Sequence, residues 1–347
     1  MRLVFVALWL LLCSIACGPI GGTTPDTGSG VATVAAGGGS GASGSGLMGS
    51  AGARPANPHG RTSLIWIWQD YGTAITKVRQ NANSFTHASP ALYQMNYDYQ
   101  SGVVKSASAY TDGLSGEAMA MELHAAGIKV VPLMYAGAGN NGVDLGIQNV
   151  LNNPTIAENF IDAQVQEAID KGYDGWNLDW EVGSTTDAQY GQSLITFLTA
   201  FKTALHAHQM ELSFDLGGWY VKQCTSSGGS GLVDLKAFGS AVDQAIIEDY
   251  AGSFDGPTSK CPDVVPDIQS CDSFGSELAL MCATTNSTVS IGLITPGSNP
   301  FAPQALDAIA SYGFTSVALW PDSLFLDSAG IPNSATWFSV LGNWLAE

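Results

Sequence analysis

The chain has 347 residues, enough to bury a large core, and it is 46% hydrophobic with only 12% charged residues. Its 30 acidic and 12 basic residues give a formal net charge of −18. So acidic a surface repels phosphate backbones, and we therefore expect no nucleic-acid partner, whereas neutral glycans are not excluded.

The amino-terminal region has the pattern of an export signal. In residues 1–17, Arg2 supplies the positive start, and the apolar run that follows is too short to span a bilayer. The box at 14–17 resembles a bacterial lipoprotein cleavage site ending in Cys17, although Ser14 stands where Leu is usual. We expect a secreted protein or a cell-surface lipoprotein attached to a membrane through a lipid on Cys17. Residues 18–59 are mostly Gly, Ser, Ala, Thr and Pro and predict a flexible linker.

Residues 60–347 alternate between strand and helix patterns. Apolar runs at 64–68, 85–96, 129–135, 173–180, 211–216, 245–250, 289–295 and 316–320 predict eight strands, with Ser89-Pro90 interrupting the second. Helical patterns occur at 73–81, 117–126, 153–172, 194–206, 302–312 and 335–345. In the third of these, Asn153 is the expected cap and Gly172 the expected stop, and the apolar stripe is Phe160, Ile161, Val165 and Ile169. This alternation and length predict one (β/α)₈ barrel. A doubly wound open sheet would need a Gly-rich phosphate loop after the first strand, which residues 68–72 do not provide.

The predicted strand at 173–181 carries the chemistry. Side chains alternate between the faces of a strand, so Trp176, Leu178 and Trp180 share one face and Asn177, Asp179 and Glu181 the other. Buried polar side chains are costly unless they bond each other or do chemistry. Two neighbouring carboxylates tend to retain one proton near neutral pH, which suits a general acid at the carboxyl end of a barrel strand.

The run from Asp174 and Gly175 to Asp179 and Glu181 resembles the signature D-G-x-D-x-D-x-E of glycoside hydrolase family 18, the chitinase-like barrels. Asn177 stands where the family has an acid that shares charge with Asp179. Residues 151–181 look most like the spore-cortex glucosaminidases and chitobiases of that family. The resemblance implies hydrolysis of β-linked N-acetylglucosamine with retention, in which the 2-acetamido oxygen of the substrate is the nucleophile. In agreement, the predicted strand at 289–295 has no carboxylate.

The resemblance also implies roles for individual residues. Glu181 would be the general acid/base, and Asp179 would hold and polarise the acetamido group. Asn177, Asp174 and Tyr250 would support them, with Tyr250 binding the acetamido oxygen. Trp320 would floor the sugar pocket. Tyr135, Asp215 and Trp68 complete the predicted substrate-binding set, and Asp215, at the end of the predicted strand at 211–216, either faces the site or caps a turn. Residues 135–137 stand in place of the Ser-x-Gly-Gly that the family has after its third strand.

Two other functions stay open at this point. The first is a glycosidase with a protein nucleophile, for which Glu248 is the candidate. The second is a glycan-binding barrel without activity, because folds outlive activities. Keeping both Asp179 and Glu181 favours an enzyme, because binding alone does not need an acid. The sequence does not choose between chitin oligomers, peptidoglycan and N-glycan cores.

Four cysteines in the folded part, Cys224, Cys261, Cys271 and Cys282, predict two disulfides, with three pairings open. We expect no metal and no cofactor, because no Cys-x-x-Cys or His-x-x-x-His spacing is present. The alternating His206 and His208 are expected near a helix end. The expected state is a monomer acting on a carbohydrate.

Overall fold

The computed structural model describes residues 57, 59–98, 100–108, 114–137, 143–181, 188–216, 235–248, 288–294, 306–307, 309–310, 313–320 and 334–347. The predicted signal sequence, the predicted linker up to residue 56, Cys17, Tyr250 and the four cysteines lie outside these residues, so the predictions on them stay predictions.

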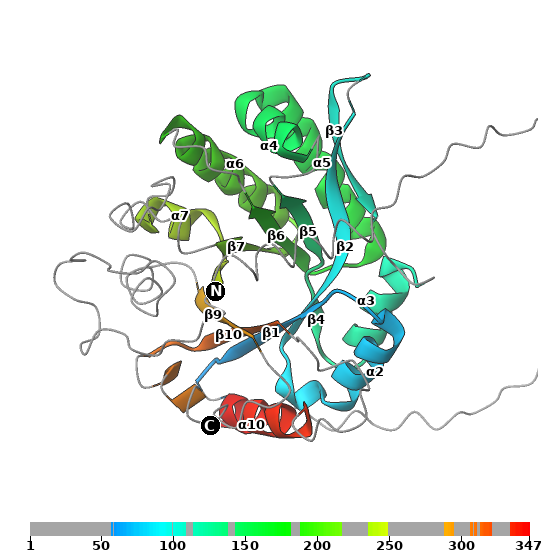
Figure 1. The fold of residues 1–347 in the computed structure, drawn as a ribbon, viewed down its shortest axis with the longest axis vertical. Coiled ribbons are helices and arrows are strands. Elements are labelled where there is room, and N and C mark those ends of the chain that lie inside the picture. Colours follow the sequence, from blue (N-terminus) through cyan, green and yellow to red (C-terminus); the bar gives the residue numbers. More distant parts are fainter. Residues whose placement is uncertain are drawn as a thin grey trace, which may run out of the picture. The chain divides into compact units, whose positions relative to one another are not determined.

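Eight parallel strands close into a barrel, which confirms the predicted (β/α)₈ fold (Figure 1). They are β1 (Thr62–Ile67), β2 (His87–Asp98), β4 (Lys129–Val130) continued by β5 (Leu133–Gly137), β6 (Gly175–Glu181), β7 (Glu211–Leu216), β8 (Gln244–Glu248), β9 (Thr288–Ile294) and β10 (Ser316–Trp320). The pairing of β1 with both β10 and β2 closes the ring. The strand predicted at 129–135 is divided into β4 and β5, with Pro132 between them. Pro132 has no backbone N–H that could donate a hydrogen bond to a neighbouring strand.

Helices surround the barrel (Figure 1). Those with described bounds are α2 (Tyr71–Gln80), α3 (Gly116–His124), α4 (Val143–Asn152), α5 (Pro154–Lys171), α6 (Ala188–His206), α7 (Leu235–Ala241) and α10 (Ser334–Ala346), with a 3₁₀ turn at Ala82–Ser84. As predicted, Asn153 caps α5 by accepting from the N–H groups of Thr155 and Ile156, and Gly172 ends it in a left-handed conformation. None of the described helices is both long and apolar enough to cross a bilayer.

Two local expectations were wrong, and one hairpin was missed. Pro90 does not interrupt the second strand: β2 runs through it, and its pairing with β5 shifts between Ala91 and Tyr93. Beyond that shift β2 extends into an antiparallel hairpin with β3 (Val103–Ser108), which the sequence did not suggest. Ile169, expected in the apolar stripe of α5, is 42% exposed, whereas Phe160, Ile161 and Val165 are buried as predicted.

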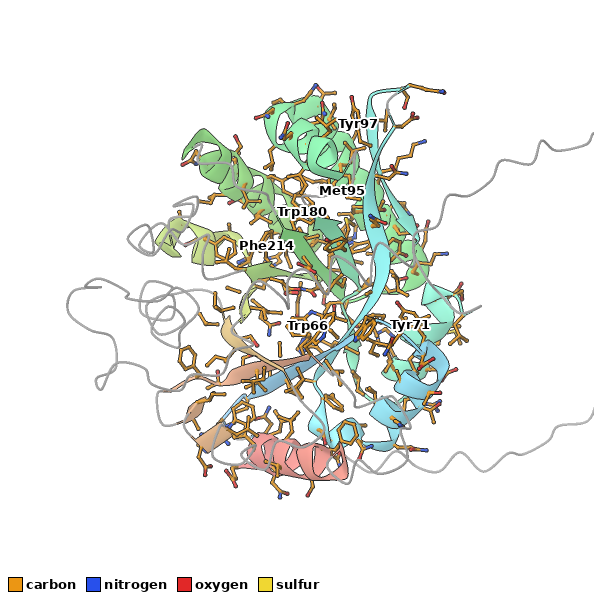
Figure 2. The ribbon with its side chains drawn as sticks, viewed as in Figure 1. Trp66, Tyr71, Met95, Tyr97, Trp180 and Phe214 are labelled. Atoms are coloured by element: carbon orange, nitrogen blue, oxygen red, sulfur yellow. The ribbon has the colours of Figure 1, made fainter. Side chains whose placement is uncertain are left out.

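The outward face of β6 fixes this strand against its helices. The indole of Trp176 donates to the carbonyl of Gln164 on α5 at 3.0 Å, and Trp180 stacks on Phe197 of α6 at 5.1 Å between ring centroids. The inward face meets a separate apolar cluster inside the barrel, which includes Trp66 of β1 (Figure 2). The predicted division of β6 into an apolar and a polar face is confirmed, and it directs Asn177 and Asp179 into the barrel.

The amino ends of the strands carry a repeated clamp. Asp174, just before β6, accepts from the N–H of Val130 at 2.7 Å and pairs with His124 at the end of α3. Asp243, just before β8, accepts from the N–H of Leu212 at 2.9 Å and pairs with His206 at the end of α6. In both cases the His precedes the bonded N–H by six residues along the chain. A carboxylate thus fastens one strand to its neighbour twice around the barrel.

Gly175, the Gly of the resemblance, stands where β6 comes closest to β7. A Cβ atom built on it would lie 2.0 Å from the carbonyl oxygen of Glu211, which no side chain tolerates. Glycine is therefore required here for close approach of the two backbones. The first half of the predicted signature, Asp174 and Gly175, therefore lies at the amino end of the barrel.

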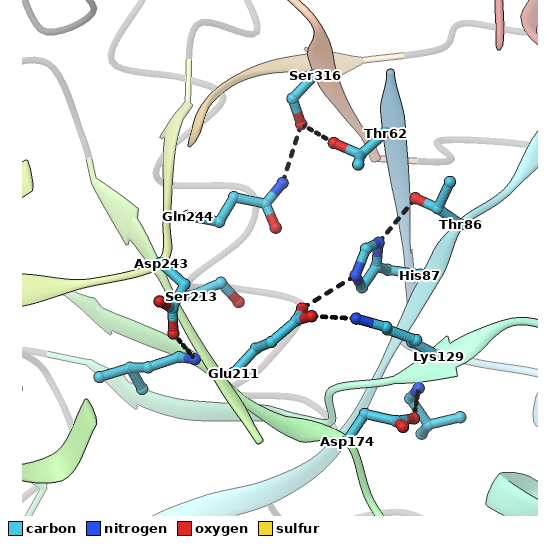
Figure 3. A network of polar contacts seen from close by, with 12 residues as sticks. Thr62, Thr86, His87, Lys129, Asp174, Glu211, Ser213, Asp243, Gln244 and Ser316 are labelled. Atoms are coloured by element: carbon cyan, nitrogen blue, oxygen red, sulfur yellow. Dashed lines mark hydrogen bonds and ion pairs between the residues drawn. The ribbon is translucent and has the colours of Figure 1, made fainter. Parts of the chain in front are cut away.

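Glu211 connects three strands at this end (Figure 3). Its carboxylate bonds the ring of His87 on β2 at 3.1 Å and pairs with Lys129 on β4. Burial raises the pKa of Glu211, but the hydrogen bonds and charges of His87 and Lys129 outweigh it and lower the pKa to about 2. A cavity of about 480 Å³ opens beside these groups, at the opposite end of the barrel from Asp179.

We expect Glu211→Gln to destabilise the fold in a pH-dependent manner. Because the folded-state pKa of Glu211 lies below its ordinary value of 4.5, the ionised group stabilises the fold fully above pH 4.5. That contribution is lost as the pH falls toward about 2. Urea unfolding of the wild type and of Glu211→Gln at several pH values should therefore show a difference in unfolding free energy that narrows as the pH falls from 4.5 toward about 2. The matched control is Glu122→Gln, since the pair of Glu122 with Arg79 is exposed on both sides and contributes little. A gap that stayed constant with pH would contradict the pairing.

Candidate active site

The inward positions of β6 lead to the carboxyl end of the barrel. Asn177 lies fully buried and Asp179 is 6% exposed. On β5, Leu133 pairs with Asn177, Tyr135 with Asp179, and Gly137 with Glu181. Glu181 is the last residue of β6. It follows Asp179 by two residues and therefore has the same parity along the strand. The order of the three predicted residues along the strand is as the sequence indicated.

Asn177 lies at the centre of a buried hydrogen-bond network. Its Oδ1 accepts from the indole Nε1 of Trp66 and from Oγ of Ser89, each at 2.9 Å. Its Nδ2 donates to Oδ1 of Asp215 at 2.8 Å. These partners come from β1, β2 and β7, so one amide joins four strands of the barrel. Asp215 faces the interior and is buried at 4% exposure.

Three indoles line the opposite side of the interior. Trp320, at the end of β10, stacks on Trp68 with ring centroids 5.9 Å apart and planes within 7°. Trp320 also meets Trp66 at 6.0 Å with tilted planes. Trp68 and Trp320 are partly exposed, whereas Trp66 is buried. An aromatic surface of this kind suits the apolar face of a sugar ring.

The structure thus brings together most of the predicted site residues. Asn177, Asp179, Asp215, Tyr135, Trp68 and Trp320 lie on inward positions at or near the carboxyl end of the barrel. Asp174 does not join them: its carboxylate lies at the amino end, where it holds Val130 and His124. Strand β6 separates Asp174 from Asp179, and the supporting role predicted for Asp174 stays a prediction. Tyr250 lies outside the described residues.

Sequence reasoning missed two members of this network, Trp66 and Ser89. The signal for Trp66 was present, because strand alternation gives it the same face as Trp68. Ser89 falls in the break that Pro90 suggested for the second strand. Since the strand continues, Ser89 stays on an inward position and reaches Asn177.

No group of three or more His, Cys, Asp or Glu side chains suited to a metal ion occurs among the described residues. The polar atoms of the site are carboxylates, amides, hydroxyls and indole N–H groups. What they can do is donate and accept hydrogen bonds and transfer protons beside an aromatic surface.

Solved structures similar to this chain include chitinases and a spore cortex-lytic enzyme. The chain is similar to a chitinase from Chromobacterium violaceum, with 15% identity, a TM-score of 0.60, and coverage of 83% of this chain and 99% of that one. The spore cortex-lytic enzyme SleL of Bacillus megaterium gives 15% identity and 0.58, over 82% of this chain and 74% of that one. A glycoside hydrolase family 18 N-acetylglucosaminidase from Paenibacillus barengoltzii gives 11% identity and 0.56, over 82% and 99%.

The barrel has the fold of the family 18 chitinases. No protein-family profile and no curated protein matches the sequence itself. At 11–15% identity the likeness concerns the fold of these chitinase-like barrels.

Proposed function

We propose that the protein is a glycosidase that hydrolyses β-linked N-acetylglucosamine in glycans such as chitin oligomers or peptidoglycan. The observation that carries the proposal is the buried pair Asn177 and Asp179 on β6, with Asn177 bonded to the indole of Trp66 and Glu181 as the last residue of the same strand. A binding barrel needs the indoles but has no use for two acids, Asp179 and Glu181, at alternate positions of one strand. In barrels of this architecture, active sites lie at this end.

In the proposed reaction, Glu181 protonates the glycosidic oxygen of the leaving sugar. Asp179 holds the N–H of the 2-acetamido group, so that the acetamido oxygen attacks the anomeric carbon and displaces the leaving group. Glu181 then removes a proton from water, which attacks the same carbon and restores the acetamido group with overall retention. Trp320 and Trp68 offer the surface on which the sugar ring lies.

The setting of the reaction is part of the proposal. The export signal at 1–17 and the linker at 18–59 favour a barrel that works outside the cytoplasm, either free or attached through Cys17. The linker would hold the barrel away from the membrane and bring it to a polymeric glycan. A monomer is sufficient, because every group invoked belongs to one chain.

The test compares two substrates that differ only in the acetamido group. We expect the protein to release product from N-acetylated oligosaccharides and to leave the de-N-acetylated forms uncut, since the latter lack the nucleophile. Cleavage of both forms, with a covalent glycosyl-enzyme trapped on a carboxylate such as that of Glu248, would establish a protein nucleophile instead. Binding without release of product from any N-acetylated glycan would establish the glycan-binding barrel.

A further inference from the structure

The amide of Asn177 has only one possible orientation. An indole N–H cannot accept a hydrogen bond, so the atom that faces Trp66 Nε1 must be the amide oxygen. The hydroxyl of Ser89 adds a second donor to the same oxygen. The amide nitrogen is thereby turned toward Asp215, to whose Oδ1 it donates at 2.8 Å.

Asp215 explains why position 177 is an amide. An aspartate at this position would still accept from Trp66 and Ser89, but its second oxygen would face the Asp215 carboxylate at 2.8 Å. Two buried carboxylates at that distance cannot both be ionised without a large cost. The amide at 177 and the acid at 215 are therefore a matched pair.

Asp215 also lies beside Asp179. Leu178 pairs with Phe214 in the β6–β7 ladder, so the same register sets Asp179 next to Asp215. Neighbouring strands lie about 4.8 Å apart, and both side chains are buried on inward positions. The other titratable residues at strand positions of the same parity at this end, within the described part of the chain, are Tyr135 on β5, Glu181 on β6 and Glu248 on β8.

We propose that Asp215 is a positioning residue of this site: held by the Asn177 amide, it supplies beside Asp179 the negative charge that the family signature places at position 177. The inference rests on the proposed glycosidase function. A negative charge next to the acids of β6 makes loss of their remaining proton harder, and that proton is the one the leaving sugar needs. Compared with the family signature, the negative charge lies on β7 instead of β6, and it still lies next to Asp179.

The test is a charge swap between the two positions. Asp215→Asn keeps a hydrogen bond to Asn177 but removes the charge, so we expect kcat to fall by roughly 10²-fold and the alkaline limb of the kcat/KM profile to move to lower pH. Asn177→Asp alone should be at least as harmful, because it sets two carboxylates against each other. In the double variant Asn177→Asp/Asp215→Asn, the carboxylate introduced at position 177 accepts from Trp66, from Ser89 and from the amide introduced at position 215. This double variant should recover both the rate, to within about tenfold, and the position of the limb.

Asp243→Asn is the matched control, because it makes the same chemical change in a carboxylate at the other end of the barrel. It should lower thermal stability and leave the pH profile in place. A folded double variant no more active than the worse single variant would overturn the inference. So would an Asp215→Asn enzyme with an unchanged pH profile and a raised KM, since that result assigns Asp215 to substrate binding.

Failure of the proposed function gives a different result. If the wild type cut no N-acetylated glycan, the pair would be judged from unfolding in urea alone. Asn177→Asp should then lower the midpoint, and adding Asp215→Asn should restore it. Recovery of the midpoint without turnover would uphold the pairing and reject the glycosidase. Recovery of neither would reject the pairing itself.

Discussion

Glu181→Gln is expected to lower turnover by about 10²–10⁴-fold while substrate binding persists. Gln keeps the shape and the hydrogen bonds of Glu but has no proton that it can transfer to the leaving oxygen, and general acid catalysis is typically worth this factor. Glu181 ends β6, on the same parity as Asn177 and Asp179, so the substitution changes the chemistry at the mouth of the barrel. The measurement is steady-state release of product from an N-acetylated oligosaccharide, with KM and kcat determined separately.

Glu158→Gln is the control for this prediction. Glu158 lies exposed on α5, and its substitution should leave both constants as they are in the wild type. A Glu181→Gln enzyme that kept its rate would show that the general acid is a different residue. The glycan-binding alternative would show itself earlier, as a wild type without turnover and a variant with unchanged affinity.

Gly175→Ala is expected to cost about 3 kcal/mol of unfolding free energy or more. The new Cβ would lie 2.0 Å from the carbonyl oxygen of Glu211, and the obstacle is backbone that cannot turn away as a side chain would. Strands β6 and β7 would have to separate at their amino ends, where Glu211 also holds His87 and Lys129. Urea unfolding followed by circular dichroism gives the difference.

Gly172→Ala separates steric contact from backbone conformation. Gly172 has φ of 71°, and nothing lies within 4 Å of a Cβ atom built there. Its substitution should cost only about 1 kcal/mol, the penalty of a left-handed residue with a side chain. Equal losses in the two variants would mean that the close approach of β6 and β7 does not require a glycine.

Much of the fold followed from local patterns. The alternation of apolar and polar residues in β6 predicted which face carries Trp176 and Trp180. The strand lies between helices and a filled barrel interior, and burial on both sides leaves few possible directions for its side chains. Asn153 and Gly172 marked the ends of α5 by their own conformational preferences. The β2–β3 hairpin was missed, because β3 (Val103–Ser108) begins with two apolar residues but continues with mostly polar ones, which is a weak strand pattern.

The site was predicted only as far as it lies on one strand. Asn177 and Asp179 follow from strand alternation, but the partners of Asn177 come from β1, β2 and β7. Contacts between residues 38 to 111 positions apart depend on the register of the closed barrel, which a local pattern does not contain. Asp174 belongs to the same sequence motif as Asp179, but the structure places it at the amino end of β6, because a strand holds its two ends far apart.

The contacts of Glu211 have a mechanical meaning for the distant end of the barrel. Glu211 on β7 reaches His87 on β2 and Lys129 on β4, strands that are not its neighbours in the sheet. The two contacts are chords across the ring rather than links along it. Flattening the ring into an oval would stretch one chord or the other, so the cross-section is braced at its base. Asn177 joins β1, β2 and β7 further along the barrel. The contacts of Glu211 at the amino end therefore hold the cross-section in which Asn177 and its partners lie.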